Sequence, residues 1–291
     1  MRTAYLLVFH GSRDPRPQAA VEMLAELVSQ SSDRTWAADN AEELAAAPVA
    51  EQSRLKPMVG TACLELSPVP LHQQLKEFGD RALANGYNSM QVVPLFLLPG
   101  VHVMEDIPES VALAQQALGQ ELKIDLRPYL GTHTGLENLV ATQLFATKAD
   151  AWILLAHGSR RAGSKHPVEA MAKQLGSQAA WQLESRTGVV VEAYWSQAPR
   201  LESRVKELVS AGYRQIGIMP YFLFAGGITD AIAQSVEQLK MHFPSALLQL
   251  AEPLGASAEL ADLIVDLITS PSKPLGRSGQ KPRVRGEEVF G

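Results

Sequence analysis

Short apolar runs alternate along most of the chain with longer stretches in which apolar residues recur at helical spacing. The apolar runs are nearly continuous, which is typical of strands covered on both faces, as in parallel sheets with crossover helices. We expect strands at residues 5–9, 61–66, 90–97, 123–127, 152–156, 189–195, 215–222 and 246–250. Helices are expected at 18–29, 71–85, 108–118, 168–178, 200–211 and 229–242. The pattern predicts an α/β fold in two halves, each an open, mainly parallel four-stranded sheet flanked by helices.

The second half of the chain repeats the motifs of the first in the same order. His-Gly-Ser-Arg follows the first strand of each half, at His10 and His157, and a Gly-Tyr pair precedes the third strand, at Gly86 and Gly212. Both glycines stand where a helix is expected to end. We therefore divide the chain into repeats at residues 1–147 and 148–270. Residues 31–57 are expected to form a surface insertion in the first repeat, and the tail at 271–291 to be disordered.

Composition limits the classes of protein to which the chain can belong. The formal net charge of -5 disfavours a general nucleic-acid binder, and a single cysteine excludes an internal disulfide. No apolar run approaches the length of a membrane span, and the N-terminus lacks a signal-peptide pattern. We expect a cytoplasmic protein that binds neither a membrane nor nucleic acid.

Candidate chemistry gathers at the strand ends of the first half. His10 ends the first predicted strand, Glu65 lies near the end of the second, and His102 follows the third. Parallel strands of one sheet bring their carboxyl ends to one rim, where ligands of such sheets bind. Two imidazoles and a carboxylate suit Fe(II), Co(II), Ni(II) or Zn(II), and three ligands leave coordination positions open for exchange. Neutral histidine also accepts protons at cellular pH.

In this arrangement the sequence resembles the class II tetrapyrrole chelatases of the sirohydrochlorin chelatase (CbiX) type, in their long, double-repeat form. The resemblance covers residues 3–269 and depends on motifs taken together and in order: the strand followed by His-Gly-Ser-Arg, Leu-Glu-Leu-Ser at 64–67, Pro-Leu-Phe-Leu-Leu-Pro-Gly at 94–100, and Gly-Val-His at 100–102 followed by Asp-Ile-Pro at 106–108.

The resemblance implies a function and a site. It implies ATP-independent insertion of Fe2+ or Co2+ into sirohydrochlorin, on the way to siroheme or cobalamin, with His10, Glu65 and His102 as the catalytic and metal-binding residues. The divalent metal would be a substrate, and no tightly bound cofactor is expected. The two repeats would face a central cleft as an internal pseudo-dimer within a monomer.

The second half departs from the motif pattern. It keeps His157, but aligning the Pro-x-Phe-Leu segments puts Ile228 where the first half has His102, and aligning Ser196 with Ser67 puts Tyr194 opposite Glu65. We expect a degenerate repeat that closes the cleft and binds the periphery of the macrocycle.

Sirohydrochlorin is a polycarboxylate, so an acidic protein needs local cations and hydrogen-bond donors to bind it. Such side chains follow both strand-end histidines. We assign substrate binding to Ser12, Arg13, Arg16, Arg160 and Arg161, with Lys165 close by.

Two other functions remain open at this stage. A non-catalytic carrier of a tetrapyrrole or of metal would use the same residues to hold cargo. A histidine-dependent phosphatase fits the sequence less well. A resemblance to that family would require the motif Arg-His-Gly, whereas Phe9 and Ala156 precede the histidines here. Neither common nucleotide-binding glycine motif is present.

Overall fold

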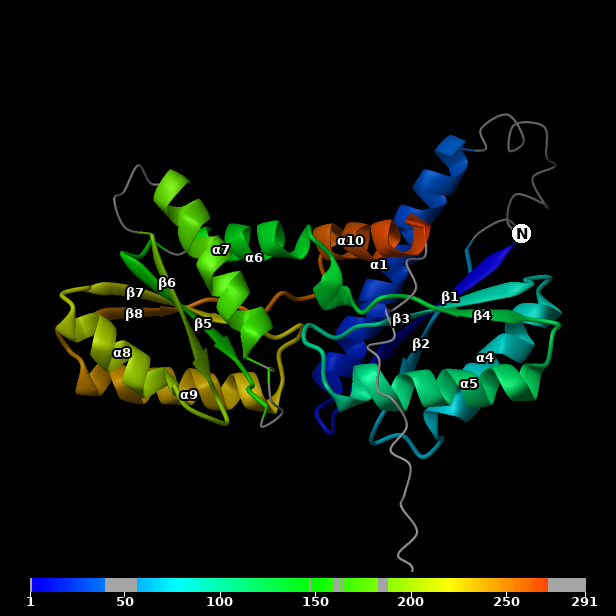
Figure 1. The fold of residues 1–291 in the computed structure, drawn as a ribbon, viewed down its shortest axis with the longest axis horizontal. Helices are drawn as coiled ribbons and strands as arrows, with labels where there is room; N and C mark the ends of the chain where they lie inside the picture. Colours follow the sequence, from blue (N-terminus) through cyan, green and yellow to red (C-terminus); the bar gives the residue numbers. More distant parts are fainter. Residues whose placement is uncertain are drawn as a thin grey trace, which may run out of the picture.

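The computed structural model describes residues 2–39, 57–146, 148–159, 163, 165–182 and 188–271. They form two α/β halves side by side, each with helices on both faces of a central sheet (Figure 1). The predicted insertion beyond residue 39 and the predicted disordered tail from residue 272 lie outside the described residues.

Each half contains a four-stranded sheet in which all strands are parallel. The orders are β2-β1-β3-β4 and β6-β5-β7-β8, so the two sheets have the same topology. The strands of the first sheet are β1 (Thr3–Phe9), β2 (Val59–Cys63), β3 (Ser89–Pro94) and β4 (Lys123–Leu126). Those of the second are β5 (Ala151–Ala156), β6 (Val189–Tyr194), β7 (Gln215–Pro220) and β8 (Leu247–Leu250). Continuous apolar runs therefore predicted every one of these strands, and the fold class is confirmed.

The predicted crossover helices are present, with changed ends. They are α1 (Pro15–Asp39), α4 (Leu71–Ala84), α5 (Ile107–Leu118), α7 (His166–Gln182), α8 (Leu201–Ser210) and α9 (Gly227–His242). Gly86 and Gly212 follow α4 and α8 at φ of +78° and +98°, as expected for residues that end helices. The expected start of the insertion at residue 31 is wrong, because α1 continues there. Ser31 and Ser32 are buried, and Ser31 Oγ donates to Asp262 Oδ1 at 2.6 Å.

Two helices that the sequence pattern did not predict exchange sides between the halves. Helix α6 (Leu136–Ala146) ends the first repeat but packs into the core of the second sheet, around Trp152 and Leu154. Helix α10 (Ala258–Thr269) ends the second repeat but packs against α1 and the first sheet. The packing boundary therefore crosses the division of the chain at residue 147.

A buried arginine fastens α10 to the first sheet. Arg127, which is 2% exposed and directly follows β4, donates from Nε to the carbonyl oxygen of Leu267 at 3.0 Å and from Nη2 to that of Ser270 at 2.5 Å. Its Nη1 is 3.2 Å from Asp125 Oδ2. The last carbonyls of a helix lack partners within the helix and carry the negative end of its dipole. The guanidinium supplies hydrogen bonds to these carbonyls and a positive charge that interacts favourably with the dipole.

No described helix is both long and apolar enough to cross a membrane.

We predict that Arg127→Leu lowers the free energy of unfolding by about 3 kcal/mol, because the helix end loses charged donors in a buried position. Denaturant titration measures the change. Lys123→Leu is the matched control, since this exposed residue lies on the same strand and its loss is expected to cost less than about 0.5 kcal/mol. Equal stability of the two variants would contradict the capping role of Arg127.

Candidate metal-insertion site

Three side chains from three loops meet at the carboxyl edge of the first sheet. His10 directly follows β1, Glu65 follows β2, and His102 follows β3. One ligand atom from each lies within 4.8 Å of the others. Glu65 lies between the imidazoles, with Oε2 at 3.9 Å from His10 Nε2 and Oε1 at 3.7 Å from His102 Nε2. The sequence-predicted N,N,O set is therefore brought together.

Strand register places these residues. Beyond the last paired strand residues, Phe9 and Cys63, the ladder continues through backbone hydrogen bonds from Leu64 N–H to the Phe9 carbonyl (2.9 Å) and from Glu65 N–H to the His10 carbonyl (2.8 Å). His10 and Glu65 are thus held side by side by the backbone before their side chains interact. A one-residue slip would turn Glu65 to the other side of the ladder.

The cluster is open to solvent on one side. The side chains of His10, Glu65 and His102 are 53%, 48% and 32% exposed. The two imidazole rings are 4.9 Å apart and nearly perpendicular, and the Phe96 ring lies 6.4 Å from each. An ion held there would keep coordination positions directed outward, as a site that exchanges its metal requires. Phe96 lies in the Pro-Leu-Phe motif but was not among the residues predicted for the site.

Gly11 allows the β1 and β2 loops to approach each other. Its φ is +101°, and a Cβ there would lie 2.2 Å from the Glu65 carbonyl oxygen and 2.5 Å from Cys63 Sγ. The Cys63 thiol donates to that same carbonyl at 2.6 Å, and burial raises its pKa. The Gln74 side-chain amide holds the Cys63 backbone, accepting from its N–H at 2.9 Å and donating to its carbonyl at 2.8 Å.

His102 opens a short π-helical turn, His102–Asp106, that continues into α5. His102 Nδ1 lies 2.7 Å from Asp106 Oδ2. By contrast, the contact of His10 Nδ1 within the described part of the chain is to the carbonyl oxygen of its neighbour Gly11, at 3.3 Å. The spacing of His102 and Asp106 was visible in the sequence motif, but the contact depends on the π turn, which no sequence pattern indicated.

The second half keeps one of the three ligand positions. His157 follows β5 as His10 follows β1, and its Nδ1 lies 3.0 Å from the Gly158 carbonyl oxygen. Ile228 occupies the position of His102, since Pro220 pairs with β5 as Pro94 pairs with β1. The alignment of Tyr194 with Glu65 is wrong. Ser196, whose N–H binds the His157 carbonyl at 2.9 Å, is the equivalent of Glu65.

The misalignment has a physical reason. Tyr194 pairs with Ala156 within the ladder, as Cys63 pairs with Phe9, and it is buried. Matching the motifs by their serines displaces this strand by two residues. The loop from the strand to the next helix is one residue shorter in the second half, which accounts for one of the two. Neither Tyr194 nor Ser196 supplies a carboxylate. Among the described residues, the cluster of side chains that could hold a metal ion is the one in the first half.

Arg16 is paired with two carboxylates, one from each half of the chain. Its guanidinium joins two carboxylates, with Nη2 at 2.5 Å from both Asp14 Oδ2 and Asp230 Oδ2 and Nη1 at 3.0 Å from Asp230 Oδ1. Hydrogen bonds from Arg16 lower the pKa of Asp14 to about 2 and also lower that of Asp230. Arg16 thus bridges the two halves, and its assignment to substrate binding stays a prediction.

The other predicted substrate-binding residues have different surroundings. Ser12 Oγ accepts from the Asp14 N–H at 3.0 Å, and Arg13 is exposed beside it. Lys165 Nζ donates to the Ala198 carbonyl at 2.7 Å. Arg160 and Arg161 lie outside the described residues.

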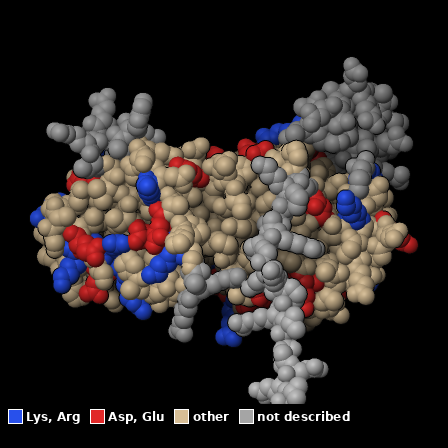
Figure 2. Space-filling model, in the orientation of Figure 1, with Lys and Arg blue, Asp and Glu red and all other residues tan. Residues whose placement is uncertain are grey.

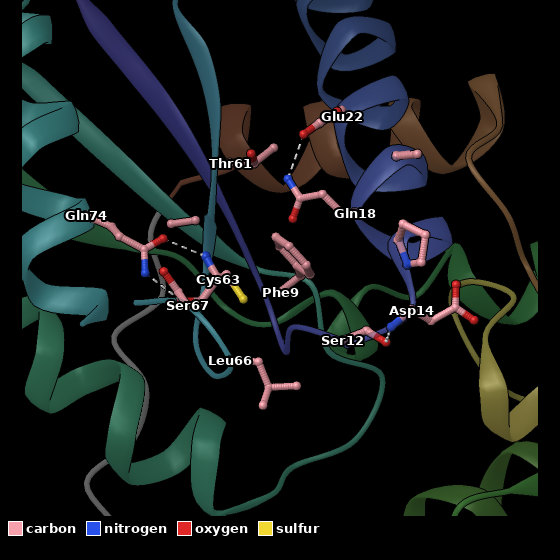
Figure 3. Close-up of a pocket in the computed structure, with 13 residues that line it drawn as sticks. Phe9, Ser12, Asp14, Gln18, Glu22, Thr61, Cys63, Leu66, Ser67 and Gln74 are labelled. Carbon is pink, nitrogen blue, oxygen red and sulfur yellow. Dashed lines mark hydrogen bonds between the residues drawn. The ribbon is translucent and has the colours of Figure 1, made fainter. Parts of the chain in front are cut away.

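A pocket of about 590 Å³ lies next to the cluster, between the start of α1 and the end of β2 (Figure 3). Ser12, Cys63 and Leu66 line it, but none of the three ligand residues does. Asp14 and Glu22 add carboxylates to its lining, which disfavours binding of another carboxylate there. On the face shown in Figure 2, Lys and Arg are interspersed with Asp and Glu and form no large basic patch.

The fold and cluster define a duplicated α/β protein with a His, Glu, His site of metal-binding type in its first half. The CbiX family model matches residues 4–147 and again 151–270, so the chain belongs to the CbiX family. The double match confirms the internal repeat.

Relatives and solved structures agree with this family. A sirohydrochlorin cobaltochelatase from Priestia megaterium is 23% identical over 267 residues, which cover 89% of this chain and 76% of the relative. A sirohydrochlorin ferrochelatase from the same organism is 24% identical over 213 residues, covering 72% and 76%. The structure of SirB from Bacillus subtilis with Fe3+ matches with a TM-score of 0.65 at 22% identity, covering 92% of this chain and 94% of that one.

We predict that Gly11→Ala weakens Co2+ binding at least about 10-fold, because the new methyl group would displace the Glu65 backbone. Gly212→Ala is the matched control. It also forces alanine into positive φ, at +98°, but a Cβ there meets nothing within 4 Å. Cobalt titration of both variants separates displacement of the site from backbone strain. Unchanged affinity in Gly11→Ala would show that the close approach does not position Glu65.

Proposed function

We propose that this protein is a sirohydrochlorin chelatase, which inserts a divalent metal ion into the tetrapyrrole without ATP. The observation that carries the proposal is the cluster of His10, Glu65 and His102, whose ligand atoms lie within 4.8 Å of one another at the sheet edge of a CbiX-family chain. Metal insertion needs such a set, because the ion must be bound loosely enough to be transferred.

The same three side chains meet the proton requirement of the reaction. A free-base tetrapyrrole loses its inner N–H protons as the metal enters, so proton acceptors must face the ring. Neutral imidazole and carboxylate groups both bind divalent metals and accept protons. Their exposure on one side leaves room for a flat macrocycle to lie over them, with the ion passing directly from the cluster into the ring.

Exposed apolar side chains flank the ligands along the chain and support this placement. Leu66 follows Glu65, while Val101 and Met104 lie on either side of His102, and all three are exposed. Apolar surface suits the face of a macrocycle whose carboxylates lie at its edge. We assign binding of those carboxylates to Ser12 and Arg13, together with Arg160 and Arg161. The role of the second half is to bind the periphery of the substrate.

Iron and cobalt are the metals that we propose. The curated relatives are named for one or the other, and an N,N,O set binds both. The metal is a substrate and no resident cofactor is part of the proposal. We further propose that the protein acts as a monomer, in which the second repeat supplies the other side of the substrate cleft.

An anaerobic insertion assay tests the proposal. Purified protein is mixed with excess sirohydrochlorin and Fe2+, Co2+ or Ni2+, and the change in the tetrapyrrole absorption spectrum is followed. Many turnovers per chain are expected with Fe2+ or Co2+. Binding of tetrapyrrole or metal in a stoichiometric amount without turnover would indicate a carrier instead, and hydrolysis of a phosphate ester would indicate the phosphatase.

We predict that His10→Ala and His102→Ala each lower the insertion rate by about 10²–10⁴-fold, because each removes a metal ligand and proton acceptor. His157→Ala is the matched control, since this histidine has the same place in its repeat and the same contact to the following glycine. His157→Ala should lower the insertion rate far less than the first-half variants do. An equal loss in His157→Ala, with normal fold and substrate affinity, would mean that the second half takes part in the chemistry.

Arg13→Ala should raise KM for sirohydrochlorin more than it lowers kcat, because contacts to peripheral carboxylates are equal in the ground and transition states. The difference should shrink at high salt, which screens exposed charges. Arg13→Lys, which keeps the charge, should recover part of the affinity. Unchanged KM at low salt would remove Arg13 from the substrate site. The same measurement on Arg160→Ala tests the second half.

A further inference from the structure

We propose that Asp106 is a positioning residue for metal transfer: it fixes the ring of His102 in the tautomer whose Nε2 lone pair faces the cluster. His102 is then the anchoring metal ligand, and His10 is the less constrained one. The inference rests on the proposed function for its role in turnover, whereas its effect on metal binding stands on geometry alone.

The contact determines which nitrogen carries the proton. Asp106 Oδ2 lies 2.7 Å from His102 Nδ1, and an ionised carboxylate can only accept a hydrogen bond. Nδ1 therefore carries the proton, and Nε2, which is 3.7 Å from Glu65 Oε1, keeps its lone pair for a metal. A carboxylate behind a metal-binding histidine fixes the orientation of the ring and strengthens its donor atom.

The two histidines of the cluster are supported differently. The Nδ1 of His10 has a neutral carbonyl oxygen at 3.3 Å, contributed by the adjacent residue Gly11. That contact recurs at His157, in a half that lacks the other ligands, so it belongs to the loop and is not specific to a metal site. Among the contacts of these three histidines within the described residues, only the Nδ1 of His102 has a carboxylate at hydrogen-bond distance.

The π turn brings Asp106 to His102. The defining hydrogen bond of the turn runs from the Ile107 N–H to the His102 carbonyl, five residues back. A π turn accommodates one extra residue in a helix without changing the helix on either side. Such single-turn insertions occur frequently at functional sites.

Comparison of the two repeats locates the extra residue. Val103 and Ile107 are buried at a spacing of four, while their counterparts Thr229 and Ile232 are buried at a spacing of three. Helix α9 is regular from Gly227, with no π turn. The added residue of the first repeat therefore lies within residues 104–106, next to the metal-type cluster.

The second repeat lacks the ligand, the extra residue and the carboxylate together. Ile228 stands in place of His102. Ala231 directly precedes Ile232, as Asp106 directly precedes Ile107, so that place has no carboxylate. The neighbouring Asp230 binds Arg16 instead. Their joint absence from the half without a metal cluster links the π turn to the ligand rather than to helix packing.

Helix capping does not account for Asp106. It precedes α5 with helical angles, φ -66° and ψ -44°, and its side chain makes no capping hydrogen bond. Its carboxylate is directed to the imidazole instead.

The test is an anaerobic Co2+ titration of the full-length protein without tetrapyrrole, followed by visible absorption and then by turnover kinetics. Asp106→Leu should weaken Co2+ binding about 10–100-fold and alter the cobalt spectrum. Asp106→Asn keeps the shape of the side chain and a neutral acceptor, so it should weaken Co2+ binding less. If the leucine variant does not fold, the Co2+ affinity of Asp106→Asn provides the test. In turnover, KM for the metal should rise while KM for sirohydrochlorin stays the same.

Glu109→Leu is the matched control, because it removes a carboxylate from an exposed position three residues further along α5. It should bind Co2+ like the unmodified protein. Cobalt affinity within twofold of the unmodified protein in both Asp106 variants would overturn the inference, as would an equal loss in Glu109→Leu. If the unmodified protein binds cobalt but shows no turnover, the proposed function fails, while weaker binding in Asp106→Leu still supports the positioning role.

Discussion

The structure depends on one geometric constraint, the alignment of parallel strands at a common edge. The backbone hydrogen bonds that follow Phe9 and Cys63 carry the ladder past both strands and hold His10 beside Glu65. β3, on the other side of β1, adds His102. The candidate site thus follows from strand order and register, and loops of the same composition on a different sheet order would not bring these groups together.

Both repeats satisfy that constraint, and only one has the full ligand set. The second sheet has the same order and the same strand-end histidine, so the fold by itself provides no metal site. What differs is chemical: a serine for the carboxylate, an isoleucine for the second imidazole, and a helix without the π turn. The second repeat therefore keeps the fold and one histidine without the His, Glu, His set of the first.

The sequence predicted the strands and the meeting of His10, Glu65 and His102 because both depend on local pattern. Strands buried on both faces are apolar throughout, and a histidine after such a strand must lie at the sheet edge. Helices α6 and α10 were missed because neither connects two strands of its own sheet, and their packing partners lie in the other half. Likewise, the pairing of Arg16 with Asp230 was not predicted, because the two residues are 214 positions apart in the sequence. The place of Ser196 was missed because the serines of the two motifs lie at different distances from their strands, a difference that only the strand pairing reveals.

The helix exchange also affects the order in which the protein can be completed during synthesis. The strands next to the candidate metal ligands leave the ribosome first. Leu260 and Ile264 of α10 pack against the apolar face of α1, so this face stays uncovered until α10 is made. The ligand-bearing half is therefore finished after the half that follows it in the chain. Because each half contributes a helix to the core of the other, we expect the two to unfold in a single transition, and a nick at residue 147 would leave both cores incomplete.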